Sequence, residues 1–222
     1  MESTASIMEV PIFQADLETE DKPPIDRLYV SMELYKDVTN RNEIVQLSVQ
    51  INSKWTLLSQ DNSKDDTTSR QEEDTQNMLN FDVLHIVIKP EMITSTEHIS
   101  HAISRAATNA INRKVHSNNF TTEVVYMMGG SSSVTKCMQE ICIQQETDNN
   151  EAITLMLISI SKDKSFGTFN NMIKGTRVDL NKLNEYTNNE LIAKAFKCSQ
   201  KELQLPGGIN ACVLGRIGTK RI

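Results

Sequence analysis

The segment from Gly129 to Lys136, GGSSSVTK, contains the residue types that hold phosphate groups in nucleotide-binding proteins. It lies between an apolar run and a helical pattern, and helix N-termini attract anions through their unpaired backbone N–H groups. A Walker loop, however, requires the order G-x-x-x-x-G-K-[ST], and no glycine directly precedes Lys136. A turn followed by serine helix caps explains the segment more simply. A nucleotide-binding enzyme that uses the Gly129–Gly130 turn stays as an alternative.

Two histidines come closest to a metal-binding pair. His98 and His101 are spaced to lie on one side of a helix, but Glu97 stands before both. The order therefore differs from the His-Glu-x-x-His motif of zinc proteases. On a helical wheel both histidines fall opposite the apolar side chains of Ile99 and Ile103. We therefore expect both to face solvent, and we predict no metal site.

The cysteines could in principle supply a nucleophile, a zinc site or a disulfide. No two of them form a Cys-x-x-Cys pair, and nothing in the sequence pairs any of them with a histidine. We expect reduced, buried thiols in an intracellular protein, and no bound cofactor. The four are Cys137, Cys142, Cys198 and Cys212.

Hydrophobic periodicity predicts the elements that position these residues. Short apolar runs predict strands over 27–36, 83–89, 122–128 and 152–160. Helical spacing predicts helices over 40–55, 94–111, 134–141, 165–174, 189–196 and 209–217, the last one starting at Pro206-Gly207-Gly208. This order favours an α+β fold, in which a small mixed or mostly antiparallel sheet has helices packed on it in a single domain.

Two segments do not fit the pattern of a packed domain. Residues 1–26 are acidic and weakly apolar, so we predict a mobile leader before a single domain over 27–222. Residues 59–77 contain no apolar side chain, so we predict a disordered insertion, because nothing offsets its ordering entropy.

The longest apolar run, 153–160, is far shorter than the roughly 20 residues of a membrane span. We therefore expect no membrane partner.

Charged and apolar residues indicate interactions rather than catalysis. The formal net charge of −6 disfavours broad nucleic-acid binding but leaves room for a local basic patch. Small basic groups occur after the long helix and near residue 222, and each is either solvated charge or an RNA contact. The last helix carries more apolar side chains than one buried stripe needs. That pattern indicates either a partner surface or burial on most sides.

Several short segments together resemble the PRPK-binding protein family. They are 34–38 (LYKDV), 121–126 (TTEVVY) before a serine-rich turn, the strand at 153–160, 174–183 (KGTRVDLNKL) and 216–220 (RIGTK). The similarity covers about residues 27–58 and 84–222, and the leader and the 59–77 insertion are extra.

The resemblance implies a non-catalytic adaptor without a cofactor or a small-molecule substrate. Members of this family are subunits of the KEOPS (EKC) complex, which makes N6-threonylcarbamoyladenosine on tRNA. They bind the small atypical kinase PRPK directly and help to present the tRNA 3′ end. By resemblance we expect indirect contact with other KEOPS subunits and a location in the cytoplasm and nucleus. A stand-alone RNA-binding protein is the alternative from a different class.

The resemblance also suggests where the partners bind. The residues expected to bind the kinase are Ile209, Val213, Leu214 and Ile217. The residues expected to bind tRNA are Arg113, Lys114, Arg216, Lys220 and Arg221.

Overall fold

A computed structural model describes residues 6–12, 27–53, 79, 81–112, 114–117, 119–145 and 151–220. Its strands are β1 (Ser6–Pro11), β2 (Arg27–Val38), β3 (Val83–Ile88), β4 (Ile153–Ser161) and β5 (Thr176–Val178). Its α-helices are α1 (Arg41–Asn52), α3 (Thr96–Ile111), α4 (Phe120–Met128), α5 (Val134–Ile141), α6 (Asn189–Ala195), α7 (Gln200–Leu203) and α8 (Gly208–Thr219). Short 3₁₀ turns are η2 (Pro90–Met92), η3 (Phe169–Met172) and η4 (Leu180–Glu185). No helix in these described ranges is both long enough and apolar enough to cross a membrane.

The sheet confirms the predicted α+β class. Within the described residues it has five strands, in the order β1-β2-β4-β3 with β5 also paired to β2, and every pairing is antiparallel. β4 lies between β2 and β3, where Ile158 is opposite Met32 on one side and Ile86 on the other. Because helices or turns cover both faces of β4, its sequence is a nearly continuous apolar run.

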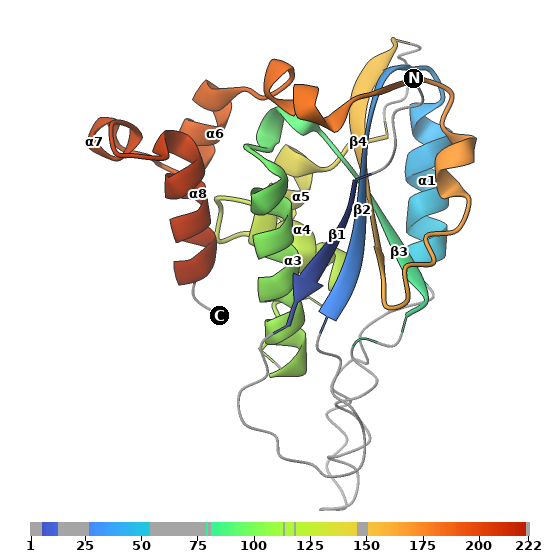
Figure 1. Cartoon of the computed structure of the whole chain (residues 1–222), viewed down its shortest axis with the longest axis horizontal. Helices are drawn as coiled ribbons and strands as arrows, with labels where there is room; N and C mark the ends of the chain where they lie inside the picture. Colours follow the sequence, from blue (N-terminus) through green and yellow to red (C-terminus); the bar gives the residue numbers. More distant parts are fainter. Residues whose placement is uncertain are drawn as a thin grey trace, which may run out of the picture.

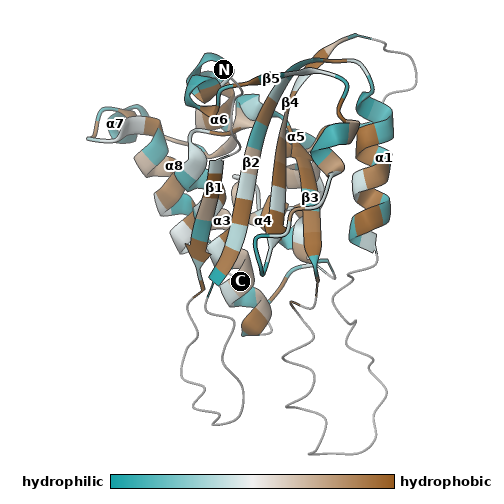
Figure 2. Cartoon of the chain, turned by 45° about the vertical axis from the view of Figure 1, so that its right-hand side comes forward, coloured by the Kyte–Doolittle hydropathy of each residue, from teal (hydrophilic) through white to brown (hydrophobic). Residues whose placement is uncertain are grey.

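The two faces of the sheet have separate apolar cores. Val30 and Leu34 of β2 face α3 and α4, and they join the larger core with Ile158 of β4. Tyr35 and Leu157 point to the other face and pack with α1 and η3. Figure 1 shows α3, α4 and α5 on one side of the sheet, α1 on the other, and α6 to α8 grouped beyond α3. Figure 2 shows the hydrophobic residues of β3 and β4 between these layers.

The predicted strand over 122–128 is wrong, because these residues belong to α4. Asn119 caps this helix by accepting hydrogen bonds from the backbone N–H groups of Thr121 and Thr122, at 2.8 and 3.4 Å. Every side chain from 124 to 128 is buried. A helix buried on all sides cannot be distinguished from a strand by periodicity, and the β-branched and aromatic residues of this run favour a strand.

The predicted mobile leader is wrong for Ser6–Pro11, which form β1 and pair with β2. Val10 of this strand is buried in the larger core. Ser104 of α3 donates a hydrogen bond to the Pro11 carbonyl at 2.7 Å and so fixes the end of the strand. The rest of the leader, apart from Ile12, lies outside the described residues, as does the whole predicted insertion at 59–77.

The predicted helix over 165–174 is reduced to η3, a single 3₁₀ turn at Phe169–Met172. The side chain of Asn40, at the start of α1, instead forms hydrogen bonds with backbone groups of this segment. Its Nδ2 donates to the Met172 carbonyl at 2.8 Å, and its Oδ1 accepts from the Lys174 N–H at 2.9 Å. The Asn40 side chain therefore holds a distant loop and makes no cap hydrogen bond to its own helix.

Candidate docking surface and basic cleft

Asn210 anchors helix α8 to the start of α3. The Oδ1 atom of Asn210 accepts hydrogen bonds from Thr94 Oγ1 at 2.8 Å and from Ser95 Oγ at 3.0 Å. Ser95 is also the N-cap of α3, because its Oγ accepts from the backbone N–H of His98. The two helices are therefore joined at their first turns, and α8 stands beside α3 on the side away from the sheet (Figure 1).

Two of the four residues predicted to bind the kinase are core residues. Val213 and Ile217 are buried in a small apolar cluster with Ile192 of α6 and Phe196, which directly follows α6. Ile209 is half-buried and packs against the same cluster, whereas Leu214 is half-buried and is not part of it. The structure thus separates a packing stripe on α8 from a face that a partner can reach. Kinase binding by these four residues stays a prediction, and of the four only Leu214 does not belong to or pack against this cluster.

The opposite face of α8 consists of very small residues. Ala211, Gly215 and Gly218 are exposed, and their spacing places them on one side of the helix. We call these three residues, with the neighbouring Leu214, the outer face of α8. A Cβ atom on Gly215 or Gly218 would have no described neighbour within 4 Å. Neither glycine has a positive φ, so neither packing nor backbone geometry within the described chain requires glycine there.

The residues predicted to bind tRNA differ in how available they are. Arg113 and Arg221 lie outside the described residues. Lys114 is exposed after α3. Arg216 forms an ion pair with a glutamate of α7, with 2.9 Å between Nη2 and Oε1, and Lys220 points into the protein. Binding of tRNA by these five residues stays a prediction, and Arg216 and Lys220 already have partners within the chain.

Lys220 closes the C-terminal end of α4. Its ammonium donates to the carbonyl oxygens of Tyr126 and Gly129, the latter at 2.9 Å. The last carbonyls of a helix lack intrahelical partners and carry partial negative charge, so a cation is favourable there. Burial lowers the pKa of Lys220. The sequence could not show this inward orientation, because a lysine near residue 222 resembles ordinary surface charge.

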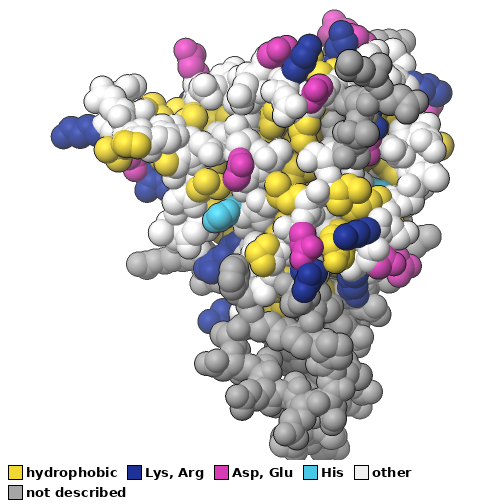
Figure 3. Space-filling view, in the orientation of Figure 1, with side chains coloured by type: hydrophobic (Ala, Val, Ile, Leu, Met, Phe, Trp, Pro, Cys, Tyr) yellow, Lys and Arg dark blue, Asp and Glu magenta, His cyan; other side chains and the backbone are white. Residues whose placement is uncertain are grey.

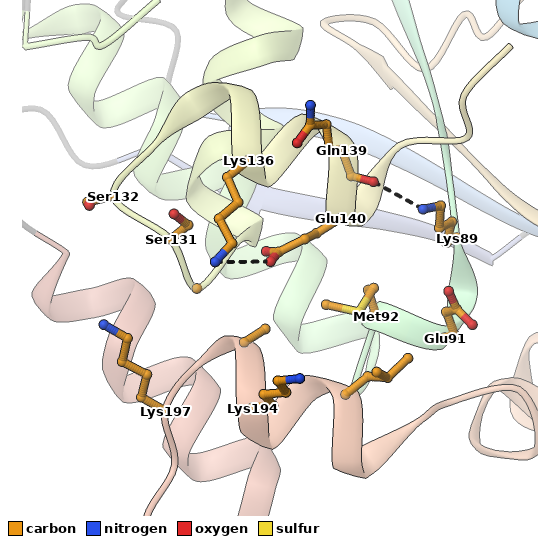
Figure 4. Close-up of a pocket in the computed structure, with 13 residues that line it drawn as sticks. Lys89, Glu91, Met92, Ser131, Ser132, Lys136, Gln139, Glu140, Lys194 and Lys197 are labelled. Atoms are coloured by element: carbon orange, nitrogen blue, oxygen red, sulfur yellow. Dashed lines mark hydrogen bonds and ion pairs between the residues drawn. The ribbon is translucent and has the colours of Figure 1, made fainter.

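A cleft of about 600 Å³ opens between α5 and α6 (Figure 4). Its basic side chains are Lys89, Lys136, Lys194 and Lys197. Lys136 pairs with Glu140 at 3.7 Å, and Lys89 Nζ donates to the Gln139 carbonyl at 3.1 Å. Neither Lys194 nor Lys197 has an ion-pair partner among the described residues. Sequence reasoning missed this cleft, because the lysines come from separate segments and no basic run marks them.

The cleft has the chemistry to hold phosphate groups. Its four lysines outnumber the two carboxylates that line it, those of Glu91 and Glu140. The exposed side chain of Ser132 and the half-buried Ser131 stand at its rim, before the first turn of α5. In Figure 4, Lys194 and Lys197 lie across the cleft from the α5 side chains. Ammonium and hydroxyl groups on opposite walls can contact an anion from both sides.

Gly129 and Gly130 allow neighbouring atoms to pack closely against them, because neither position has room for a side chain. A Cβ atom on Gly130 would collide with the Ala195 carbonyl at the end of α6, and one on Gly129 would collide with Cys137 Sγ. Ser133 then caps α5 by accepting a hydrogen bond from the Lys136 N–H at 3.3 Å. The interpretation of this segment as a turn followed by a serine cap is confirmed.

Comparison with known proteins decides the family. A family model described as Kinase binding protein CGI-121 matches residues 35–221. The chain belongs to this family. The match confirms the resemblance to kinase-binding proteins, and it includes both the outer face of α8 and the basic cleft. A comparison with curated proteins gave no match.

In this CGI-121 family chain, the prediction that His98 faces solvent is wrong. His98 is fully buried, where its Nε2 donates to the Met128 carbonyl at 2.9 Å and its Nδ1 accepts from the Thr94 N–H at 3.4 Å. Its ring also packs edge-on against Phe196, because α6 and α8 cover the second side of α3. Burial lowers the pKa of His98 to about 4. His101 is exposed, as predicted, and no metal-binding cluster exists among the described residues.

The cysteines of the CGI-121 family chain divide into two pairs. Cys137 and Cys142 are buried free thiols, as predicted. Burial raises the pKa of both, that of Cys142 to about 12. Cys198 and Cys212 instead form a disulfide between the end of α6 and α8, so the prediction of reduced thiols is wrong for this pair. The sequence could not indicate it, because the pairing depends on how α6 and α8 pack.

Proposed function

We propose that this chain is a non-catalytic adaptor that binds a PRPK-type atypical kinase directly through the outer face of α8. In this proposal it works in the cytoplasm and nucleus as a regulatory subunit of the KEOPS (EKC) complex. It supports N6-threonylcarbamoyladenosine modification by helping to present tRNA. Membership of a kinase-binding family supports the kinase partner, and the segments that resemble the PRPK-binding proteins support the complex.

The outer face of α8 carries the kinase part of the proposal. A glycine inside a helix destabilises it by roughly 0.5–1 kcal/mol relative to alanine. Gly215 and Gly218 have this cost, yet nothing in the described chain touches the positions where their side chains would be. A partner whose backbone approaches closely would account for them, since any side chain there would hold it away. The half-buried Leu214 beside them offers apolar contact.

A non-catalytic role is supported by the structural roles of the residues that could otherwise have taken part in catalysis. Gly130 packs on α6, and Ser133 caps α5. His98 is neutral and fully hydrogen-bonded inside the protein. The rival nucleotide-binding enzyme would need the Gly129–Gly130 turn for phosphate, but packing alone explains both glycines.

The Gly215→Leu variant tests the docking surface. The new side chain projects into open space, so we expect the protein to fold with unchanged or higher stability. Its affinity for the kinase should fall by about tenfold or more, since overpacking a contact costs about 1–3 kcal/mol. Calorimetry with the purified kinase measures this affinity.

The matched control is Gln46→Leu, at an exposed position of α1. It adds similar apolar surface on the far side of the sheet and should leave the affinity for the kinase unchanged. Equal affinities for both variants would remove the outer face of α8 from the proposal.

For tRNA, we propose the basic cleft between α5 and α6 as the contact. The supporting observation is the pair Lys194 and Lys197, whose ammonium groups have no ion-pair partner among the described residues. Free ammonium groups on a cleft wall are suited to backbone phosphates. A stand-alone RNA-binding protein would use the same cleft but would bind tRNA tightly without the kinase. The net charge of −6 makes that rival weaker.

A further inference from the structure

The disulfide between Cys198 and Cys212 joins two elements that flank a projecting segment. Cys198 comes just after α6, and Cys212 lies in α8, with 6.4 Å between their Cα atoms. This separation is within the range that a disulfide spans without movement of the backbone. Both residues are half-buried rather than enclosed. Small thiols and disulfides in solution can therefore reach this pair, whereas the other two cysteines are buried.

The segment between the two cysteines has few other attachments. It contains α7 and the turn before α8, and none of residues 199–207 is buried. Figure 1 shows α7 standing out from the rest of the molecule, and Figure 3 shows charged and hydrophobic side chains exposed on it. The capping box of Ser199 and Glu202 lies within the segment itself. The exposed ion pair between Glu202 and Arg216 links it to α8, and such pairs contribute little.

The position of Cys212 connects this segment to the outer face of α8. With about 100° between successive residues of a helix, Cys212 and Arg216 lie on one flank of α8, between the buried stripe and the outer face. The α7 segment packs along this flank through Arg216. Leu205 of the segment is 61% exposed. The segment therefore forms a rim beside the outer face, and it can add apolar contact for whatever binds there.

We propose that Cys198 and Cys212 are a reversible redox clamp, which orders the 199–207 segment when oxidised and releases it when reduced. Oxidation by glutathione disulfide removes two protons and two electrons from the two thiols. The Cys198–Cys212 bond forms through a mixed disulfide, the S–S bond of glutathione disulfide breaks, and two molecules of glutathione leave. Reduction by glutathione reverses each step. The clamp thereby controls how much of the rim beside α8 is preorganised for a partner.

The clamp itself is tested without any partner. The full-length protein is equilibrated in buffers of graded glutathione to glutathione disulfide ratio, alkylated with N-ethylmaleimide and mapped by mass spectrometry. We expect Cys198 and Cys212 to become protected together in one transition, while Cys137 and Cys142 stay unreactive throughout the native state. A pair that stays reduced at every ratio, or that only accumulates separate glutathione adducts, would overturn the clamp.

Hydrogen exchange tests what the clamp does to the segment. On reduction, the amides of 199–207 should exchange faster by about fivefold or more, because the open conformations of the segment are no longer restricted by a covalent link between its ends. Amides of α3 and β4 should be unchanged. The double variant Cys198→Ser with Cys212→Ser should match the reduced protein under both conditions. Equal exchange of 199–207 in the oxidised and reduced wild type would show that the segment is ordered without the link, and would overturn the proposal.

The effect on the kinase rests on the proposed function and is measured separately. Oxidised wild type should bind the kinase about threefold to tenfold more tightly than reduced wild type, since less of the rim is ordered on binding. The double serine variant should bind like the reduced protein whether or not glutathione disulfide is present. Equal affinities would remove the clamp's role in docking. Absence of kinase binding in every redox state would instead contradict the proposed function, while the alkylation and exchange results would still decide on the clamp.

Discussion

The ammonium of Lys220 lies 3.7 Å from the centre of the Tyr126 ring and also donates a hydrogen bond to the Tyr126 carbonyl. One residue of α4 thus holds the end of the last helix through both its ring and its backbone. Gly129 contributes a second carbonyl at 2.9 Å. The same lysine therefore satisfies the end of α4 and fixes the direction of α8, which makes its role structural.

Replacing Lys220 with methionine should destabilise the protein by about 1–3 kcal/mol. The variant keeps the apolar stem but leaves two carbonyl oxygens without their charged donor, and it removes the cation from the aromatic ring. Urea denaturation measures the free energy of unfolding. Lys114→Met, at an exposed position after α3, is the matched control and should change stability by less than about 0.5 kcal/mol. A similar loss in both variants would contradict the anchoring role.

Stability should fall as the pH is lowered from about 6.5 towards 4. Burial lowers the pKa of both His98 and His85 from 6.5 to about 4 in the folded chain. Between these values the unfolded chain binds protons that the folded chain does not, so acid favours unfolding. Each unit of pKa difference is worth about 1.4 kcal/mol. Chemical denaturation at a series of pH values should show a steep slope in this window.

The pH dependence has its own matched pair of variants. His98→Gln should lower stability at neutral pH, because it disrupts the bond to the Met128 carbonyl, and it should flatten the slope between pH 6.5 and 4. His101→Gln, on the exposed side of the same helix, should leave both the stability and the slope as they are. An unchanged slope in His98→Gln would mean that His98 does not control the transition.

The sequence predicted those elements whose apolar residues follow a clear helical or alternating pattern, or form a run as long as one strand. The apolar alternation in β2 and the helical spacing in α3 predicted both, and the run 152–160 predicted the central strand. The prediction failed for α4, which is buried on every side, and for β1, whose short weakly apolar run is held by pairing with β2. Local patterns do not contain such tertiary contacts.

The same limit applied to the candidate site. The apolar residues of α8 could be identified, but Val213 and Leu214 differ only in which neighbour covers them. The burial of His98 depends on α6 and α8, which come much later in the chain. The cleft lysines likewise meet only after folding. Each missed feature joins segments that are far apart in sequence, and a single sequence has no signal for those contacts.

The same glycine-to-alanine change should have opposite effects at two positions. Gly130→Ala should destabilise the protein by about 1–3 kcal/mol, because the new methyl collides with the Ala195 carbonyl and pushes α6 away. Gly215→Ala should stabilise it by up to about 1 kcal/mol, because the methyl meets nothing and improves helix propensity. Thermal denaturation of both variants measures this. Loss of stability in Gly215→Ala would show that the outer face of α8 is already packed.

The basic cleft predicts how tRNA binding depends on salt. Removing both Lys194 and Lys197 by substitution with alanine should lower tRNA affinity and reduce the slope of log K against log salt by roughly one unit for each lysine. Both side chains are exposed, so stability should be unchanged. Filter binding at several salt concentrations, with the kinase present, gives the slope. Lys114→Ala tests the alternative contact, because Lys114 lies outside the cleft and the resemblance predicts that it binds tRNA. Lys182→Ala removes an exposed lysine outside both sites and is the control. If Lys114→Ala flattens the slope while the cleft variant does not, tRNA lies along the end of α3. The slope reports the counterions that leave the tRNA on binding, and their number depends on the phosphates contacted and not on the total charge of the protein.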